Sequence, residues 1–413
     1  MNKKVLAVAV AGVFAAPAVV LAQSSTVQLY GRITYEYGYA DQGGGRPKTD
    51  VAQTPGGSAI GFRGQEKLGG GLTAWFQCES SADVRGASQD GLCSRNSAIG
   101  FKGGWGNLHF GRWDSPFKRA VNMGTVGVQD TGLLGSAFVF AGSSTGTGAG
   151  FNDPDRNVWK RRESGLTYYE SPTFSGFQVL AAFSPGNAAT SGTNSTTSSK
   201  PRVLSLGGTW KHGPFAVGVG YEKHDEMLSR TTSVSAVGTG STALPAFATV
   251  SSTTVRGVEG NDKAWNISAS YTFANKLEIG VAYLDTKYEG VSTNGDELKR
   301  KSWIIGLDWA IQGPHGLEIG YVEADKTKGS CTSTGANTCT IGNVPPAATG
   351  VDNGAKLFEI KYRYSFSKRT SARLGYVKLK NDQGAFYALG GLSRPVSNGE
   401  DQDAIVLYLQ HNF

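Results

Sequence analysis

The chain ends on the stretch 404-AIVLYLQHNF-413, in which residues of two faces alternate up to a terminal aromatic. One face carries Ile405, Leu407, Leu409, His411 and Phe413, and the other carries Tyr408, Gln410 and Asn412. A period of two predicts a β-strand. We therefore expect the chain to finish inside a sheet, with its last residue held by a neighbouring strand.

A second stretch, 27-VQLYGRITYEYGYA-40, repeats the pattern near the start of the chain and is the expected partner of the final strand. Its apolar face carries Val27, Leu29, Ile33, Tyr35, Tyr37 and Tyr39, and its polar face carries Gln28, Arg32, Thr34 and Glu36. The same alternation recurs at 265–273, 277–283, 303–311, 317–321 and 358–364. Each segment is a candidate strand with one apolar face and one polar face.

The connections between the segments alternate as well. Seven short turns, such as 211-KHGPF-215, alternate with eight long polar linkers, so sixteen strands are predicted. Strands that run up and down in this way place all short turns at one end and all long loops at the other. The 58 glycines carry no collagen period and fit a turn-rich antiparallel sheet.

A β-sandwich and a closed barrel both explain a period of two. A sandwich core would consist of Val, Ile and Leu with few tyrosines, whereas Tyr and Trp here gather near strand ends, as in the aromatic girdles of membrane barrels. A closed barrel also leaves no strand edge unpaired in lipid. The pattern favours an all-β fold, a 16-stranded antiparallel transmembrane β-barrel.

The N-terminus has the features of a secretory signal peptide over residues 1–22. Lys3 and Lys4 precede an apolar run, and Val20-Leu21-Ala22 offers a small-residue cleavage site before Gln23. A membrane anchor is the alternative for this short run. Cleavage lowers the formal charge from +7 to +5, which is too little for a nucleic-acid-binding surface. We expect residues 23–413 to form the barrel domain.

Export also determines how the cysteines are interpreted. Cys78 and Cys93 lie near two strand ends, and Cys331 and Cys339 lie within one predicted loop. In an oxidising compartment, two short-range disulfides are the natural pairing. A metal site is the rival interpretation, but the chain has no CxxC motif and no histidine near these cysteines.

Several segments, in their order along the chain, resemble the trimeric general porins of Gram-negative bacteria, in particular the betaproteobacterial type. They are VQLYGRITYEYGYA, IGFRGQEKLGGGLTAWFQCES, SRNSAIGFKGGWGNLHFGRWDSPFK, YYESPTFSGFQVLAAFS and the C-terminal strand. Together with the signal sequence and terminal Phe413 they cover most of the mature chain.

The resemblance implies a homotrimer in the outer membrane, in contact with lipid and lipopolysaccharide and inserted by the barrel-assembly machinery. It implies a water-filled channel for small hydrophilic solutes and ions, without a cofactor, a metal or covalent chemistry. The long third loop, within residues 114–160, should fold into the lumen and place carboxylates opposite basic wall residues. Terminal Phe413 should be part of the signal that the assembly machinery reads.

The candidate pore-constriction residues follow from strand parity and from the resemblance. Arg32 and Arg63 have lumen parity, and Arg112 matches the family's lumen arginine in the segment FGRWDSP. The candidate acids are Glu79, which has lumen parity, and Asp114 and Asp130, which lie near the start of the third loop. An ordinary hydrated charge remains the alternative interpretation for each.

Two positions depart from the family pattern, because Ala59 and Tyr168 stand where relatives carry arginine. The basic ladder is then thinner, or it is rebuilt from Lys118, Arg119, Arg161 or Arg162. The net charge and the lumen-parity arginines suggest an anion preference, although Glu36, Glu278, Asp308, Glu318 and Glu359 also point inward.

Other classes of function have less support. A channel specific for a sugar, an organic acid or phosphate is the main rival, although Tyr30, Trp75 and Tyr168 are the few aromatics with lumen parity. An enzyme is disfavoured because the five histidines are scattered and neither GxSxG nor HExxH occurs. A structural or adhesive barrel would more often carry a separate passenger domain.

Overall fold

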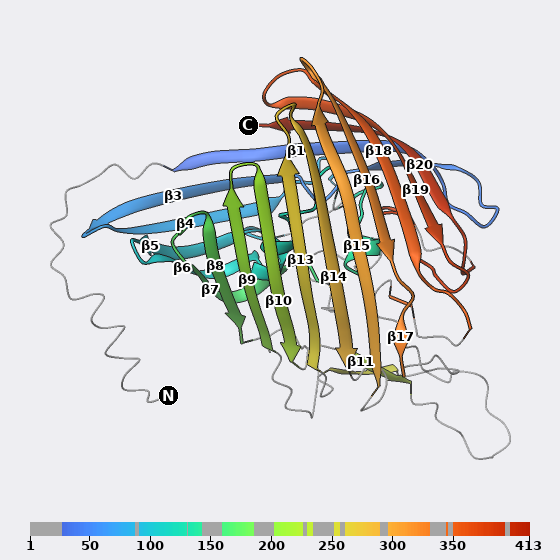
Figure 1. Ribbon diagram of the computed structural model, residues 1–413, viewed down its shortest axis with the longest axis horizontal. Helices are drawn as coiled ribbons and strands as arrows, with labels where there is room; N and C mark the ends of the chain where they lie inside the picture. The colour runs from blue at the N-terminus through green and yellow to red at the C-terminus, as the bar shows by residue number, and fades with distance from the viewer. Residues whose placement is uncertain are drawn as a thin grey trace.

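The structure, a computed structural model, describes residues 27–86, 91–129, 131–142, 159–185, 202–225, 229–233, 252–256, 261–289, 296–330, 344–345, 350–392 and 397–413. Sixteen antiparallel strands form a closed barrel, which confirms the predicted fold (Figure 1). Their bounds are β1 (Gln28–Asp41), β3 (Ala59–Gly69), β4 (Leu72–Ser81), β5 (Ser97–Gly103), β6 (Gly106–Asp114), β7 (Arg162–Glu170), β8 (Phe177–Ser184), β9 (Arg202–His212), β10 (Phe215–Asp225), β13 (Asn261–Thr272), β14 (Leu277–Glu289), β15 (Glu297–Ala310), β16 (His315–Ala324), β18 (Ala355–Ser365), β19 (Thr370–Asn381) and β20 (Gln402–Asn412).

The barrel closes where the first and last strands pair. β1 pairs with β20 from Arg32↔Asn412 to Asp41↔Asp403, and it pairs with β3 over residues 28–32. Every other strand of the barrel pairs with its neighbours in the chain, so the ladder has no free edge. The expected pairing of the C-terminal strand with the first strand is confirmed.

Four shorter strands and two short helices complete the described chain. β2 (Thr49–Gln53) extends the pairing along β1, β17 (Lys328–Gly329) pairs with β15, and β11 (Ser229–Ser233) pairs with β12 (Ser252–Arg256). Helices α2 (Pro116–Val121) and α3 (Ala137–Phe140) belong to the third long connection. Among the described residues, neither helix has the length and apolarity needed to cross a bilayer.

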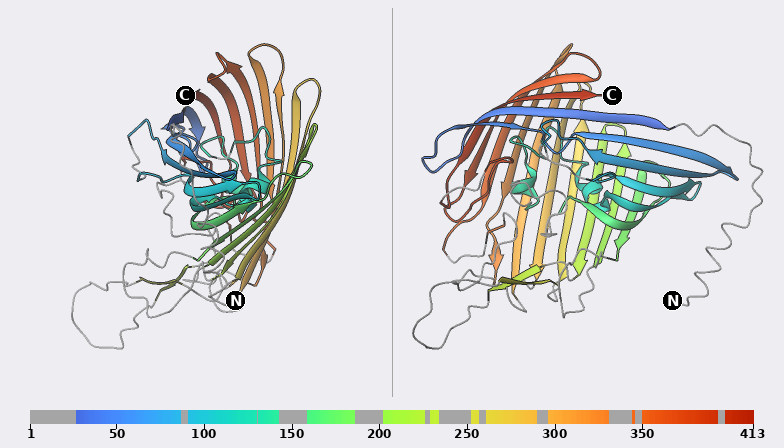
Figure 2. Two further views of the ribbon diagram at one scale, coloured as in Figure 1. Left: turned by 90° about the vertical axis from the view of Figure 1, so that its left-hand side faces the viewer. Right: turned by 180° about the vertical axis from the view of Figure 1, so that it is seen from behind.

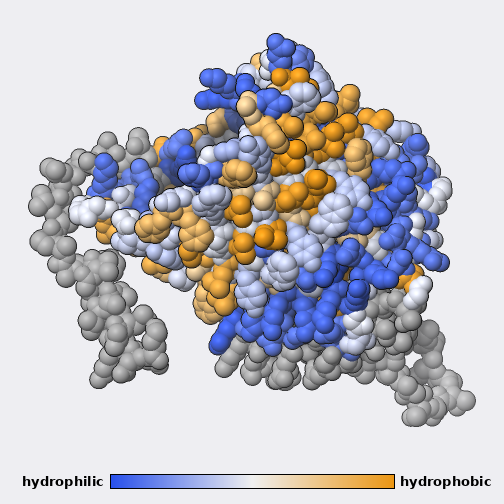
Figure 3. Space-filling view, viewed as in Figure 1, coloured by the Kyte–Doolittle hydropathy of each residue, from blue (hydrophilic) through white to orange (hydrophobic). Residues whose placement is uncertain are grey.

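The two faces of the strands differ as the alternation predicts. On β1 and β20, Leu29 is 63% exposed and Ile405 is 58% exposed, whereas Thr34 and Glu36 on the other face of β1 are fully buried. Figure 3 shows an apolar band across the strands and hydrophilic residues where they approach the long loops. The apolar face suits hydrocarbon, and the polar face lines the lumen.

The third connection lies on the concave side of the barrel (Figure 2). Helix α2 contacts β9, β10 and β13, and α3 contacts β15, β16 and β18. The described part of this connection therefore crosses the inside of the barrel along its wall, which confirms that the third loop folds into the lumen.

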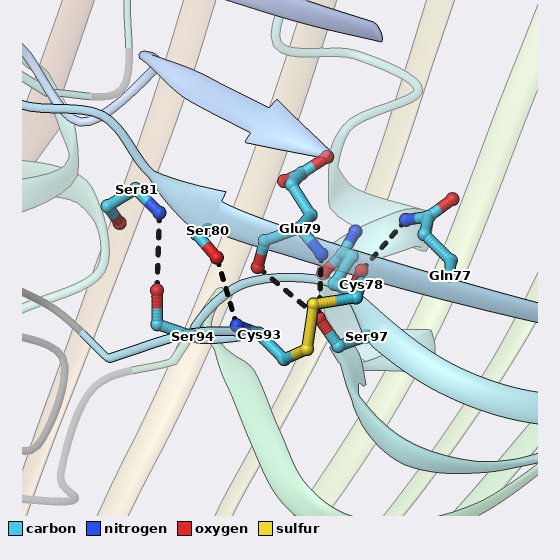
Figure 4. The surroundings of a disulfide bond; sticks show 9 residues. Gln77, Cys78, Glu79, Ser80, Ser81, Cys93, Ser94 and Ser97 are labelled. Carbon is cyan, nitrogen blue, oxygen red and sulfur yellow. Dashed lines mark hydrogen bonds between the residues drawn. A yellow bond between two sulfur atoms is a disulfide. The ribbon is translucent and has the colours of Figure 1, made fainter. Parts of the chain in front are cut away.

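A disulfide and a set of serine hydroxyls fasten the second long loop to β4 (Figure 4). Cys78 is bonded to Cys93, as predicted. Three serine hydroxyls accept hydrogen bonds from backbone amides beyond the β4–β5 ladder. Ser80 accepts from the Cys93 amide. Ser94 accepts from the Ser81 amide, and Ser97 accepts from the Glu79 amide. These side-chain bonds add to a backbone bond from the Arg95 amide to the Glu79 carbonyl (2.8 Å). The predicted Cys331–Cys339 bridge lies outside the described residues.

The terminal residue, Phe413, packs against a glycine of β1. The backbone of Phe413 exchanges two hydrogen bonds with Gly31, with N···O distances of 3.1 and 3.0 Å. A Cβ on Gly31 would overlap the Phe413 ring and would lie 2.8 Å from the Ala59 carbonyl oxygen. Only glycine leaves room on the outer face of β1 for the terminal ring.

We expect deletion of Phe413 to impair insertion into the outer membrane and to leave export across the inner membrane intact. Gly31→Ala retains the terminal residue but displaces its ring, so it should allow insertion while it destabilises the barrel by about 1–3 kcal/mol. Fractionation measures insertion, and the temperature at which the folded band is lost on detergent gels measures stability.

Gly104→Ala is the matched control, because a Cβ at Gly104 meets no atom within 4 Å. Wild-type levels of the deletion protein in the outer membrane, or an unchanged melting temperature for Gly31→Ala, would contradict this account of the C-terminus.

Candidate functional site: the pore constriction

The described part of the third loop lies directly against a row of glycines on the barrel wall. Gly280, Gly306 and Gly320 are register partners on β14, β15 and β16. A Cβ on Gly306 would overlap the Val126 carbonyl oxygen, and one on Gly320 would lie 2.8 Å from the Val128 side chain. Many of the chain's glycines therefore serve in strand interiors, as well as in the turns that their abundance suggested.

Polar lumen side chains bind the backbone of the loop that crosses this row. The Lys361 ammonium donates to the Gly127 carbonyl (2.8 Å), and the Glu359 carboxylate accepts from the Gln129 amide (3.1 Å). On β1, the Glu36 carboxylate accepts from the Leu133 amide (2.6 Å). Inward-facing Glu36 and Glu359 therefore hold the loop.

A buried arginine holds the end of the described loop. Arg300 on β15, 2% exposed, donates to the carbonyls of Val139 (2.9 Å) and Phe140 (2.7 Å) and to the Tyr387 hydroxyl (2.9 Å). The Ser302 hydroxyl also donates to the Phe140 carbonyl. Because a buried carbonyl without a donor is costly, these bonds fix α3 against the wall.

Three predicted constriction residues lie near one another on β1, β3 and β4. The Tyr30 hydroxyl donates to Glu79 (3.2 Å), and the Arg63 guanidinium lies 5.1 Å from the centroid of the Tyr30 ring. Glu79 also pairs with Arg95 of the second long loop (2.7 Å). Arg95 donates to the Gly56 carbonyl, and Arg32 donates to the adjacent Gly57 carbonyl (2.9 Å).

The other predicted residues lie at the start of the third loop. Asp114 contacts Lys118 (2.8 Å) and Arg162 (3.4 Å), so two cations offset its charge. Arg112 donates to the Ser164 hydroxyl on β7 (3.1 Å), next to a register shift between Gly111 and Trp113. Asp130 lies outside the described residues. The structure thus links Arg63 and Glu79 through Tyr30, and Glu79 and Arg32 through Arg95 and the Gly56–Gly57 backbone. Asp114 belongs to an ion cluster with Lys118 and Arg162.

The remaining candidates for a rebuilt basic ladder also contact acids. Arg119 pairs with Glu170 (2.5 Å) and Arg161 pairs with Glu163 (2.7 Å). Tyr168 is fully buried and stacks on His109 with the ring centroids 4.6 Å apart. Ala59 is the register partner of Arg32 on β3.

The opposite wall carries paired charges. Arg363 contacts Asp308 (2.8 Å) and Glu318 (2.6 Å), and Arg373 contacts Glu318 (3.1 Å). Lys361 contacts Glu318 and Glu359. Carboxylates therefore offset these three lumen cations.

Three lumen residues, Arg95, His109 and Trp113, were not singled out from the sequence. Arg95 lies in the connection between β4 and β5, where alternation gives no orientation, and its hydrogen bonds emerge only from the fold. His109 and Trp113 have the lumen parity of β6, as Asn107 has, and this signal was available in the sequence. Among the described residues, no group of three or more His, Cys, Asp or Glu side chains has the geometry to hold a metal ion.

A closed barrel with an apolar outer face and a lumen narrowed by its own loop defines a membrane-spanning diffusion channel. The family model for Gram-negative porins matches residues 6–384 of the chain. The chain therefore belongs to the Gram-negative porin family, and it is an outer-membrane channel rather than an enzyme.

Curated relatives and solved structures agree with this assignment. An outer membrane porin protein of Bordetella pertussis is 26% identical over 90% of this chain and 92% of the relative. The major outer membrane protein P.IB of Neisseria gonorrhoeae is 33% identical over 31% of this chain and 32% of the relative.

Two solved structures share the fold. The anion-selective porin from Comamonas acidovorans has a TM-score of 0.66 at 20% identity, covering 94% of this chain and all of that one. The trimer form of OmpT from Vibrio cholerae has a TM-score of 0.61 at 15% identity, covering 95% of this chain and all of that one.

We expect Arg300→Met to loosen the third loop, because the Val139 carbonyl loses its buried guanidinium donor and the Phe140 carbonyl keeps only the Ser302 hydroxyl. Single-channel currents should become noisier, and the mean conductance should change from the wild-type value. Planar-bilayer recordings in potassium chloride measure both quantities.

Arg369→Met is the matched control, since Arg369 is exposed in the short turn between β18 and β19. Currents from Arg300→Met with wild-type noise and conductance would show that Arg300 does not hold the constriction.

Proposed function

We propose that the channel is a general diffusion pore that prefers anions, with Arg32 and Arg63 as its principal attractive charges. The proposal rests on one observation. Within the described residues, Arg32 donates to the Gly57 carbonyl and Arg63 to the Gln28 amide oxygen (3.0 Å), and neither forms an ion pair with a carboxylate. Arg95, Arg119 and Arg363, by contrast, each contact a carboxylate.

A cation that is held by a neutral oxygen keeps its full charge. In a narrow lumen with low-dielectric walls, such a charge attracts anions and repels cations. The fold of the Comamonas acidovorans protein, which is described as anion-selective, supports the same preference.

Replacing Arg32 or Arg63 by Gln should shift the selectivity toward cations. A unit charge about 8 Å from the path of an ion contributes about 0.5 kcal/mol in water, and it stabilises chloride while it destabilises potassium by the same amount. Each variant should therefore lower the chloride-to-potassium permeability ratio about fivefold. The reversal potential across a planar bilayer in a potassium chloride gradient measures this ratio.

Lys368→Gln, in the exposed turn between β18 and β19, removes the same charge away from the constriction and serves as the control. A cation-selective wild-type channel would remove the proposal, and so would arginine variants with the wild-type reversal potential.

We further propose that the mature protein begins at Gln23, after cleavage of the signal peptide 1–22, and assembles as a homotrimer. The trimer form of the Vibrio cholerae neighbour and the exposed apolar face of β1 support the trimer. Insertion by the barrel-assembly machinery, with Phe413 in the recognised signal, and contact with lipopolysaccharide belong to the same proposal.

The mass of the detergent-extracted protein tests this assembly. We expect light scattering, corrected for bound detergent, to give three chains per particle. We expect mass spectrometry of the intact chain to give the mass of a polypeptide that begins at Gln23. A monomer at every concentration, or a mature chain that retains Lys3 and Lys4, would contradict the corresponding step.

A further inference from the structure

A cavity of about 920 Å³ opens on the lumen wall between β1, the strands β3 to β7 and helix α2. Its lining combines the indole rings of Trp75 and Trp113 with the cations Arg63 and Lys102 and with several side-chain amides. Asp114, Glu170 and Arg119 also line it, and each of these three is ion-paired, Asp114 with Lys118 and Glu170 with Arg119. Its volume is within the range of small-molecule sites, which join apolar surface to a few polar groups. The cavity is thus large enough to retain a solute beside the diffusion path.

The aromatic surface of this cavity is held rigidly. The Trp75 indole donates to the Asn107 amide oxygen (2.8 Å) and meets Trp113 edge to face at 5.7 Å. Trp113 in turn packs against His109 at 5.0 Å. Because neighbouring rings and a hydrogen bond fix its orientation, Trp75 can receive a flat ligand at little entropic cost.

A glycine on the neighbouring strand makes room for this ring. Gly100 is the register partner of Trp75 on β5, and a Cβ there would lie 2.9 Å from the Trp75 ring and 2.6 Å from the Cβ of His109. The absence of a side chain at Gly100 therefore leaves the space that the Trp75 indole occupies.

Two cations flank Trp75 in the sheet. Trp75 pairs with Gln65 on β3 and with Gly100 on β5, so Arg63 and Lys102 are its diagonal neighbours on opposite sides. Diagonal neighbours on one face of a sheet are about 7–8 Å apart, so each cation lies about that far from Trp75, on opposite sides of its ring. Both cations donate to neutral oxygens, Arg63 to Gln28 and Lys102 to Gln65 (2.7 Å).

We propose that this cavity is a binding site for small aromatic carboxylates. The ring of such a solute packs against Trp75 and Trp113, and its carboxylate binds the Arg63 guanidinium, with Lys102 as a second cation. A planar carboxylate matches the fork of a guanidinium, and a neutral sugar leaves both cations without a partner. The site extends the proposed anion preference, on which it rests, to a particular class of solute.

The test uses benzoate as the probe, acetate as the carboxylate without a ring, and benzamide as the ring without a charge. Single-channel currents are recorded at constant ionic strength while each probe is titrated. We expect benzoate to reduce the current saturably, with a half-saturation concentration about fivefold below that of acetate. Benzamide should have no saturable effect.

Two variants locate the site. Trp75→Ala should bring the half-saturation concentration of benzoate to that of acetate, and Arg63→Gln should weaken both carboxylates. Trp105→Ala is the matched control, since Trp105 is 45% exposed and stacks on Tyr169 in the turn between β5 and β6. It should leave benzoate block unchanged.

The proposal is overturned if wild-type channels respond equally to benzoate and acetate, if Trp75→Ala retains the benzoate preference, or if the Trp105 control loses it. The reversal potential in potassium chloride without a probe separates this result from the general anion preference. If the wild-type channel is anion-selective but benzoate and acetate reduce its current equally, the binding site is rejected and the general anion preference is retained.

Discussion

Hydrocarbon offers no hydrogen-bond partner to a peptide group, and the whole structure depends on this constraint. Each strand of the barrel must find its donors and acceptors in two neighbours, so the first strand has to meet the last. β1 meets this demand by pairing with β20 on one side and with β3 and β2 on the other. Phe413 completes the closure, because its backbone bonds to Gly31 extend the ladder to the last residue.

Closure gives the wall an apolar outer face and a polar inner face, and the third loop packs against the inner face. Its backbone groups would be unsatisfied against lipid, but the lumen face presents charged and hydroxyl side chains. Arg300, Lys361 and Glu36 bind successive parts of the loop by its own carbonyls and amides. Several lumen charges are thereby used for structure, whereas Arg32 and Arg63 have no carboxylate partner among the residues that the structure describes.

The sequence was sufficient to predict the barrel because the alternation of side chains is a local pattern and because the turns and loops between strands can be counted. It predicted the strand number, the lumen parity of Arg32, Arg63 and Glu79, and the Cys78–Cys93 bridge. It did not predict which charges offset one another, since the pairing of Glu79 with Arg95 joins a strand to a loop whose orientation has no period. The contacts of Asp114 with Lys118 and Arg162 likewise depend on the path of the third loop after the register shift at Gly111.

The row formed by Gly280, Gly306 and Gly320 gives the wall a second role besides containment. Because these three wall residues have no side chain, the loop packs directly against the strands there. A methyl group added at any of the three would meet loop atoms, so the loop would have to move away from the wall and toward the axis. Glycines of the wall thus help to set where the loop lies in the lumen.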